Sequence, residues 1–264
     1  MEPDRKPSIE GLLIDLDGTV YEGDALVPGA AETVAELRER GIPFLFTTNT
    51  SRMSRRAVVE RLAGMGLRVE PERVFTAPMA GALWLRREGL RRVLLLLPES
   101  SHEDFAGFAL VDADAEPEAV VVGDLGPGFT FERLNSAFRA LRAGARLVAI
   151  HRNRFWLPSD GPTLDAGPFV VGLEYAARVD AVLVGKPAPT FFELAVEELG
   201  VGRDRVAVVG DDPESDIRGA KAAGLLAVQV ETGKFTAGRS GTRPARERAD
   251  VRISSVADLP RSIH

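Results

Sequence analysis

Residues 11–23 of the chain read GLLIDLDGTVYEG. Three consecutive apolar side chains, Leu12 to Ile14, lead into Asp15 and Asp17, and a glycine and a threonine follow them. An apolar run without alternation is typical of a strand that is covered on both faces. In an open parallel sheet, the residues just beyond the strand ends are the ones that meet a ligand. The stretch therefore predicts a buried strand that presents two carboxylates at a binding site.

Similar apolar runs recur along the chain and alternate with helical patterns, which is the signature of parallel βαβ units. The predicted strands are 12–16, 43–47, 93–97, 119–123, 147–150, 181–184, 206–209 and 226–230. The predicted helices are 28–40, 54–64, 190–199 and 214–223. Residues 98–117, 152–167 and 232–250 break the pattern, and the last two are predicted to be loops. We predict an α/β fold with a doubly wound parallel-sheet, Rossmann-like core.

The composition excludes several classes of protein. The 264 residues are 45% hydrophobic, enough for one large domain or two ordinary ones. A net charge of -6 argues against a general affinity for nucleic acid or anionic membrane. The absence of cysteine excludes disulfides and thiol catalysis. Since the sequence also shows no apolar stretch of signal-peptide or membrane-spanning length, we expect a cytoplasmic protein.

Three further predicted strands end in polar residues. Their ends read FLFTTNTS, VLVGKPAP and VVGDDPESD. If these strands belong to one parallel sheet, their carboxyl ends meet at one edge beside Asp15 and Asp17. The side chains they add are a hydroxyl, an amide, a cation and three carboxylates, namely Thr48, Asn49, Lys186, Asp211, Asp212 and Asp216.

Electrostatics predicts what this set of side chains binds. Five carboxylates facing one lysine repel each other, or hold raised pKa values, unless a divalent cation binds them. With oxygen ligands and no histidine nearby in the sequence, the expected cofactor is Mg²⁺. Mg²⁺, a lysine and a threonine hydroxyl around one aspartate suit a phosphoryl group, whose spreading negative charge must be neutralised. The predicted partner is therefore a small phosphorylated substrate.

The motifs DLDGT, TTN, GKP and GDDPESD, in this order, resemble those of the haloacid dehalogenase-like hydrolase superfamily, and the likeness covers nearly the whole chain. The stretches TTNTSRMSRRAVVERL and LVAIHRNRFW resemble its class IIA, with the greatest likeness to the phospholysine phosphohistidine inorganic pyrophosphate phosphatase branch. The resemblance implies a catalytic core of residues 1–77 and 180–264 and an inserted α/β cap at 78–179. It also implies a homodimer formed through the cap.

The resemblance further implies a role for each motif residue. Asp15 would be the nucleophile that forms an aspartyl phosphate, and Asp17 would protonate the leaving oxygen and then deprotonate water. Thr48 and Asn49 would bind phosphate oxygens, with Lys186 as the fixed positive charge.

The remaining roles that the resemblance implies concern the metal. Asp15, Asp211 and the main-chain carbonyl of Asp17 would bind Mg²⁺. Asp216 would orient the lysine or the metal's waters, and Asp212 takes a position that some relatives fill with asparagine. The substrate stays open between small phosphomonoesters and pyrophosphate-like compounds.

Alternatives to an enzyme stay open on the residues alone. A receiver-like phosphorylation switch also uses an acidic pair, a threonine and a lysine at strand ends, although it is a single small domain without a cap. A non-catalytic phosphate-binding module on the same scaffold is the other alternative. His151, isolated after a strand, is interpreted as a structural polar group, and Arg154 is given no role. Phe155 and Trp156 stay open between a substrate-facing loop of the cap, a contact of the cap with the core and a dimer contact.

Overall fold

The structure is a computed structural model that describes residues 9–156, 161–235, 244 and 247–263. Much of the predicted loop at 232–250 therefore lies outside the described residues. The chain divides into two compact units. Unit 1 comprises Met1–Thr48, Val58–Phe75 and Lys186–His264, and unit 2 comprises Asn49–Ala57 and Thr76–Gly185. Unit 2 thus holds the predicted cap segment together with short stretches on either side of it and residues 49–57.

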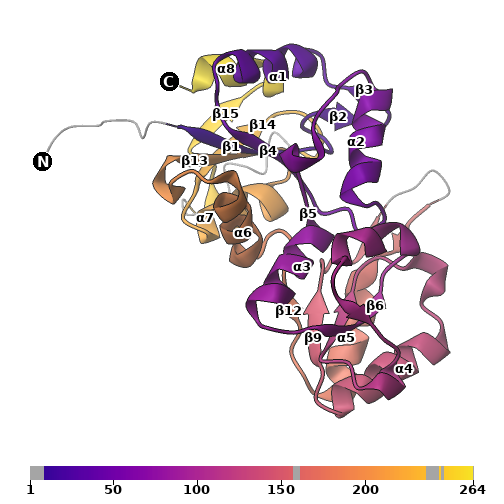
Figure 1. The fold of residues 1–264 in the computed structure, drawn as a ribbon. Coiled ribbons are helices and arrows are strands. Elements are labelled where there is room, and N and C mark those ends of the chain that lie inside the picture. Colours follow the sequence, from indigo (N-terminus) through magenta and orange to yellow (C-terminus); the bar gives the residue numbers. More distant parts are fainter. Residues whose placement is uncertain (1–8, 157–160, 236–243, 245–246, 264) are drawn as a thin grey trace, which may run out of the picture. The chain divides into compact units, whose positions relative to one another are not determined.

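Unit 1 is built on a six-stranded sheet (Figure 1). Its strand order is β15 (Val251–Ile253), β14 (Leu226–Val230), β13 (Val206–Gly210), β1 (Gly11–Asp15), β4 (Phe44–Thr48) and β5 (Val74–Thr76). The pairs from β15 through β4 are parallel. Helices α1 (Ala30–Glu39) and α8 (Leu259–Ser262) lie on one face, and α6 (Pro189–Leu199) and α7 (Arg218–Ala222) lie on the other. The predicted doubly wound α/β core is confirmed.

Local sequence explains the elements that frame the carboxyl edge of this sheet. All five residues of β1 are buried, as the unbroken apolar run predicts for a strand covered on both faces. Helix α6 begins at Pro189, whose missing N–H has no partner in a first turn anyway, and ends at Gly200, which adopts φ 71°. Two further elements of this region are α2 (Arg55–Gly64) and the hairpin of β2 (Tyr21–Glu22) and β3 (Ala25–Leu26).

The strand register aligns the ends of the central strands. Asp15 pairs with Thr47 of β4, and the preceding Ile14 pairs with Val209 of β13. The residues that follow these strands therefore emerge at the same edge of the sheet. Thr48 and the turn after Gly210 are thereby brought next to Asp15.

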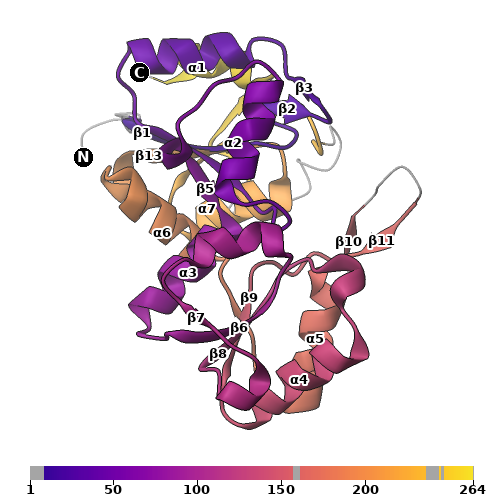
Figure 2. The same ribbon diagram turned by 45° about the vertical axis from the view of Figure 1, so that its right-hand side comes forward.

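Unit 2 is built on a five-stranded sheet whose neighbouring strands pair in parallel. Its order is β12 (Val182–Leu183), β9 (Arg146–Ala149), β8 (Ala119–Val122), β6 (Arg92–Leu96) and β7 (Ala109–Leu110). Three helices, α3 (Ala77–Arg87), α4 (Phe131–Arg142) and α5 (Ala166–Ala177), accompany it, with a hairpin of β10 (Phe155–Trp156) and β11 (Thr163–Leu164) (Figure 2). Buried side chains of α4 and α5 form one core with those of β6, β8 and β9.

The prediction that Lys186 follows a strand of the core sheet is wrong. Residues 182–183 form β12, which pairs with β9 of unit 2 through Val182 and Val148, and Leu183 and Ala149. Lys186 is the first residue of the last segment of unit 1, and the strand that precedes it in the chain belongs to the sheet of unit 2.

The predicted loop at 152–167 is also partly wrong, because it contains β10, β11 and the start of α5. Residues 157–160 of this stretch lie outside the described part of the chain. Among the described residues, no helix is both long enough and apolar enough to cross a membrane.

Candidate active site

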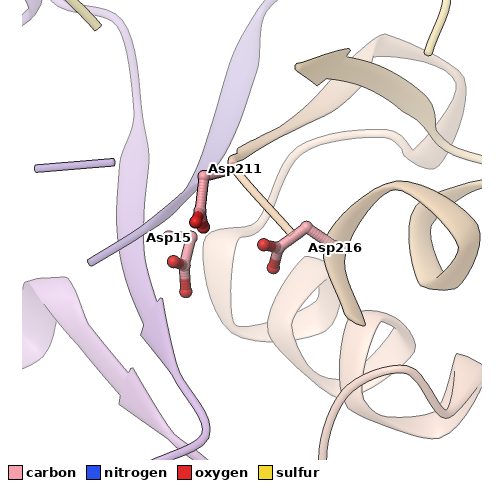
Figure 3. Close-up of side chains that lie close together, drawn as sticks. All are labelled: Asp15, Asp211 and Asp216. Atoms are coloured by element: carbon pink, nitrogen blue, oxygen red, sulfur yellow. The ribbon is translucent and has the colours of Figure 1, made fainter. Parts of the chain in front are cut away.

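Three aspartates of unit 1 meet at the carboxyl edge of its sheet (Figure 3). Asp15 ends β1, Asp211 follows β13, and Asp216 lies in the π-helical turn Pro213–Ile217. Each offers one carboxylate oxygen, and these oxygens all lie within 4.8 Å of one another. The three residues are between 1% and 8% exposed. Local motifs on separate segments therefore assemble into one buried acidic cluster.

The Lys186 ammonium is held between two of these carboxylates. Its Nζ donates to Asp15 Oδ1, and to Asp216 Oδ1 at 2.8 Å. Lys186 itself is only 3% exposed. Three buried carboxylates and one buried ammonium leave a charge of -2 when all four are ionised.

Burial and mutual repulsion shift the pKa values of this cluster. Burial raises the pKa of Asp15 to about 6, although Lys186 opposes the shift. Burial raises the pKa of Asp211 to about 7, with a further contribution from Asp216, and burial with Asp15 nearby raises the pKa of Asp216 to about 7. Burial alone would lower the pKa of Lys186, but the Asp15 and Asp216 carboxylates outweigh it and raise that pKa. The pKa values of the three aspartates stay raised although Lys186 is beside them, so this lysine alone does not compensate the negative charge of the cluster.

One atom of the cluster shows that a metal ion fits here. Asp211 Oδ2 accepts a hydrogen bond from the backbone N–H of Lys234 at 2.6 Å, whereas Asp211 Oδ1 is buried without a hydrogen-bond partner. A buried carboxylate oxygen left in this way is costly unless a cation contacts it. A hard dication would contact it and would also neutralise the charge of -2. The donor type of Asp15 and Asp211 therefore suits Mg²⁺, and so does the negative charge of the whole cluster.

The turn after β1 brings the backbone close to Asp211. Gly18 adopts φ +83°, and a Cβ there would lie 2.3 Å from Asp211 Oδ2, so only glycine fits. The Gly18 N–H donates to the Tyr21 carbonyl at 2.8 Å and closes the turn. Asp17 lies on this turn with an exposed side chain, outside the group of three carboxylates.

The two predicted phosphate-binding residues lie on either side of a unit boundary. Thr48 is the buried last residue of β4 in unit 1, and Asn49 is the first residue of this segment of unit 2. Within unit 2, a Cβ at Gly185 would lie 2.9 Å from Asn49 Oδ1, so these two residues are neighbours. Gly185 immediately precedes Lys186. The second and third motifs therefore approach each other at the points where the chain leaves one unit for the other.

Asp212 has different partners from the three clustered aspartates. Its Oδ1 accepts hydrogen bonds from the backbone N–H groups of Glu214 at 2.8 Å and Ser215 at 3.3 Å. Its Oδ2 lies 3.2 Å from Lys234 Nζ. Burial would raise the pKa of Asp212, but Lys234 and the two N–H donors lower it. Asp212 therefore caps the π-helical turn as a carboxylate and pairs with a lysine.

Residues 232–234, which the sequence predicted only as part of an exposed loop, lie against the cluster. The Thr232 hydroxyl donates to the Gly18 carbonyl at 2.5 Å, and the Gly233 N–H donates to Glu22 Oε1 at 2.8 Å. The signal that could have found them is Gly233, just beyond the strand that neighbours β13.

Buried polar residues of unit 2 form a separate set of contacts. His151 Nε2 lies 3.0 Å from Ser51 Oγ, and its Nδ1 lies 3.6 Å from Asp165 Oδ1. Burial lowers the pKa of His151, although the neighbouring carboxylates oppose this. Arg52 Nε donates to Asp124 Oδ2 at 2.6 Å. These bonds tie residues 49–57 to the rest of unit 2, which supports the structural interpretation of His151.

The aromatic pair predicted near the cap loop forms strand β10. The Arg52 guanidinium lies 4.7 Å from the centre of the Trp156 ring, and Phe155 is exposed. The contact of Trp156 with Arg52 and the exposure of Phe155 are typical of a hairpin on the surface of unit 2.

Two family models match this chain, and their matches cover much of unit 1 and part of unit 2. The model of the haloacid dehalogenase-like hydrolases matches residues 12–110, and a second HAD-hydrolase-like model matches residues 183–259. The chain is 38% identical over 230 residues to human haloacid dehalogenase-like hydrolase domain-containing protein 2, covering 87% of each chain. It is 33% identical over 265 residues to human phospholysine phosphohistidine inorganic pyrophosphate phosphatase, covering 96% of this chain and 94% of that one.

Solved structures give the same result. The p-nitrophenyl phosphatase from Archaeoglobus fulgidus superimposes with a TM-score of 0.89 at 31% identity, covering 97% of this chain and all of that one. A glycerol phosphate phosphatase from Mycobacterium tuberculosis, solved in complex with magnesium, gives a TM-score of 0.86 at 31% identity, covering 96% and 76%. The chain belongs to the haloacid dehalogenase-like hydrolase family and is a phosphatase-type hydrolase.

Proposed function

We propose that the protein is a Mg²⁺-dependent phosphatase that hydrolyses a small phosphomonoester or pyrophosphate-like substrate through an aspartyl phosphate on Asp15. The observation that carries the proposal is the cluster of three buried carboxylates around one buried ammonium, with one carboxylate oxygen left unpartnered. The phosphatase relatives, one of them solved with magnesium, support both the reaction and the metal.

In the proposed mechanism, Asp15 attacks phosphorus and Asp17 protonates the leaving oxygen. The exposed side chain of Asp17 suits a group that exchanges protons with substrate and water. Asp17 then takes a proton from the water that attacks the aspartyl phosphate, which releases phosphate and regenerates the Asp15 carboxylate. When bound, Mg²⁺ adds positive charge that stabilises the phosphoryl oxygens.

The remaining residues position the phosphoryl group. Thr48 and Asn49 bind its oxygens, and Lys186 supplies a fixed positive charge without leaving its carboxylate partners. Asp15, Asp211 and the Asp17 carbonyl bind Mg²⁺, while Asp216 orients Lys186 through their 2.8 Å contact. Unit 1 acts as the catalytic core and unit 2 as the cap that selects the leaving group.

Hydrolysis of p-nitrophenyl phosphate tests the proposal. The purified protein is expected to release p-nitrophenol when Mg²⁺ is added and to lose this activity in excess chelator. Restoring Mg²⁺ should restore the rate. A well-folded sample that stays inert with both Mg²⁺ and Mn²⁺ would instead support a non-catalytic phosphate-binding or receiver-like role.

The stabilisation by Mg²⁺ is expected to depend on pH. The three clustered carboxyls have raised pKa values of about 6 to 7 in the fold, against an ordinary value of 3.8. Without metal, their contribution to stability is therefore full below pH 3.8 and is lost as the pH rises through 6 to 7. Because Mg²⁺ binds the deprotonated form, the rise in Tm on adding Mg²⁺ should be small at about pH 5 and large at about pH 8. Scanning calorimetry with and without Mg²⁺ measures it, and an equal rise at both pH values would contradict the assignment.

The substrate and the oligomeric state need their own measurements. A panel of phosphorylated metabolites and pyrophosphate, ranked by kcat/KM, identifies the preferred leaving group. The predicted homodimer through unit 2 is supported by large exposed apolar side chains on α5, where Tyr175 is 88% exposed and Val171 is 50% exposed. Light scattering on the purified protein distinguishes a dimer from a monomer.

A further inference from the structure

We propose that residues 232–234, which we name the TGK clamp, are positioning residues that fix which oxygen of Asp211 is presented to the metal. This inference deepens the proposed function and rests on it for the identity of the metal. The clamp lies just beyond the carboxyl end of β14, beside the turn that carries Asp211.

The clamp first bonds to the turn that carries the DLDGT motif. The Thr232 hydroxyl donates to the Gly18 carbonyl at 2.5 Å, and the Gly233 N–H donates to Glu22 Oε1 at 2.8 Å. Two successive residues of the clamp are thereby held on two points of the segment that follows β1. The position of the clamp is set by this segment.

The next residue of the clamp bonds to the second acidic turn. The Lys234 backbone N–H donates to Asp211 Oδ2 at 2.6 Å, and Lys234 Nζ lies 3.2 Å from Asp212 Oδ2. With Oδ2 engaged in this way, Asp211 Oδ1 is the oxygen left buried without a partner. The orientation of the carboxylate is therefore fixed by the protein itself, which lowers the cost of organising the site.

Close packing around position 233 of the clamp leaves room only for glycine. Gly233 adopts φ +60°, and a Cβ there would lie 2.2 Å from Asp211 Oδ2 and 2.6 Å from the Gly18 Cα. Gly18 faces the same Asp211 oxygen, at 2.3 Å from its own hypothetical Cβ. The Asp211 carboxylate is thus enclosed by two glycines from different segments, and a side chain on either would displace it.

Isothermal titration of Mg²⁺ into the metal-free protein tests the clamp without any substrate. Thr232→Val removes the hydroxyl that bonds Gly18 and is expected to raise the Kd for Mg²⁺ about fivefold, the effect of one lost hydrogen bond. Thr232→Ser keeps the hydroxyl and is expected to stay within about twofold of the wild type. Gly233→Ala is expected to raise the Kd at least about tenfold, because it adds backbone strain and a clash with Asp211.

Thr33→Val is the matched control, since the Thr33 hydroxyl donates to the Val256 carbonyl at 3.1 Å elsewhere in unit 1. It is expected to lower Tm without changing the Kd for Mg²⁺. Thr232→Val and Gly233→Ala proteins that bind Mg²⁺ as tightly as the wild type would overturn the proposal, and so would a wild type that binds no Mg²⁺. If the expected Kd changes appear in a protein that hydrolyses no phosphate ester, the clamp stands and the phosphatase proposal fails.

Discussion

Asp15→Asn is expected to reduce kcat by at least about 10⁴-fold, because an amide cannot form the aspartyl phosphate that carries the proposed reaction. The substitution keeps the shape of the side chain and an oxygen that can accept the hydrogen bond from Lys186 Nζ. Steady-state hydrolysis of p-nitrophenyl phosphate at saturating Mg²⁺ measures the effect. A variant with the wild-type rate would show that another group is the nucleophile.

The same variant should keep the fold. Burial raises the pKa of Asp15 to about 6, so ionising this side chain is less favourable in the fold than in the unfolded chain. The neutral amide is therefore expected to leave the Tm of the metal-free protein at pH 8 unchanged or higher. Asp250→Asn is a control in the same unit, since Asp250 Oδ1 pairs with Lys221 at 2.6 Å, and we expect its kcat to match the wild type.

Lys186→Met is expected to have the largest effect on stability. Lys186 lies buried between Asp15 and Asp216, and its removal takes away the ammonium that contacts these two carboxylates. Breaking a buried ion pair on one side costs about 3–5 kcal/mol, so the free energy of unfolding of the metal-free protein at pH 8 should fall by about that amount. We also expect kcat to fall by at least about 10²-fold, because a fixed positive charge at the phosphoryl group is lost.

A double variant separates the effect of the buried charge on stability from the effect of Lys186 on kcat. Lys186→Met with Asp216→Asn removes one cation and one anion, so the buried charge returns to its wild-type value. Urea denaturation should show that the double variant regains much of the lost stability, whereas kcat stays low. Lys221→Met is the control, because its partly exposed pair with Asp250 should contribute no more than about 1 kcal/mol. A Lys186→Met protein as stable as the wild type would contradict the ionised cluster.

The sequence predicted the four central strands of the unit 1 sheet, β14, β13, β1 and β4, because strands covered on both faces carry their own signal in consecutive apolar residues, whereas β5 was not predicted. It failed for β12, since two residues, Val182 and Leu183, reveal no preference between two parallel sheets. Their partner, β9, lies more than thirty residues away in the chain. Helices α3, α4 and α5 were not predicted, although Thr130 is a recognisable N-cap that accepts from the Arg133 N–H.

The acidic cluster was predictable because Asp15, Asp211 and Asp216 each follow a strand within a recognisable motif, and the fold family brings those strand ends together. Residues 232–234 were not, since their bonds to Glu22 and to Asp211 of the cluster use backbone N–H groups, which every residue except proline has. Only Gly233 carries a sequence signal, and that signal is weak because glycine is common in polar loops for turn geometry alone. The roles assigned to the site residues stay predictions until the variants are measured.

The hydrogen bonds of Ser51 and Arg52 determine which segments a chimera of this protein and a relative must exchange together. Both residues belong to unit 2 although they precede its main segment by more than twenty positions, and they contact His151 and Asp124. A chimera that exchanges only residues 76–185 would therefore separate Ser51 and Arg52 from their native partners and leave buried polar groups unmatched. An exchange that keeps these contacts must therefore transfer residues 49–57 together with residues 76–185.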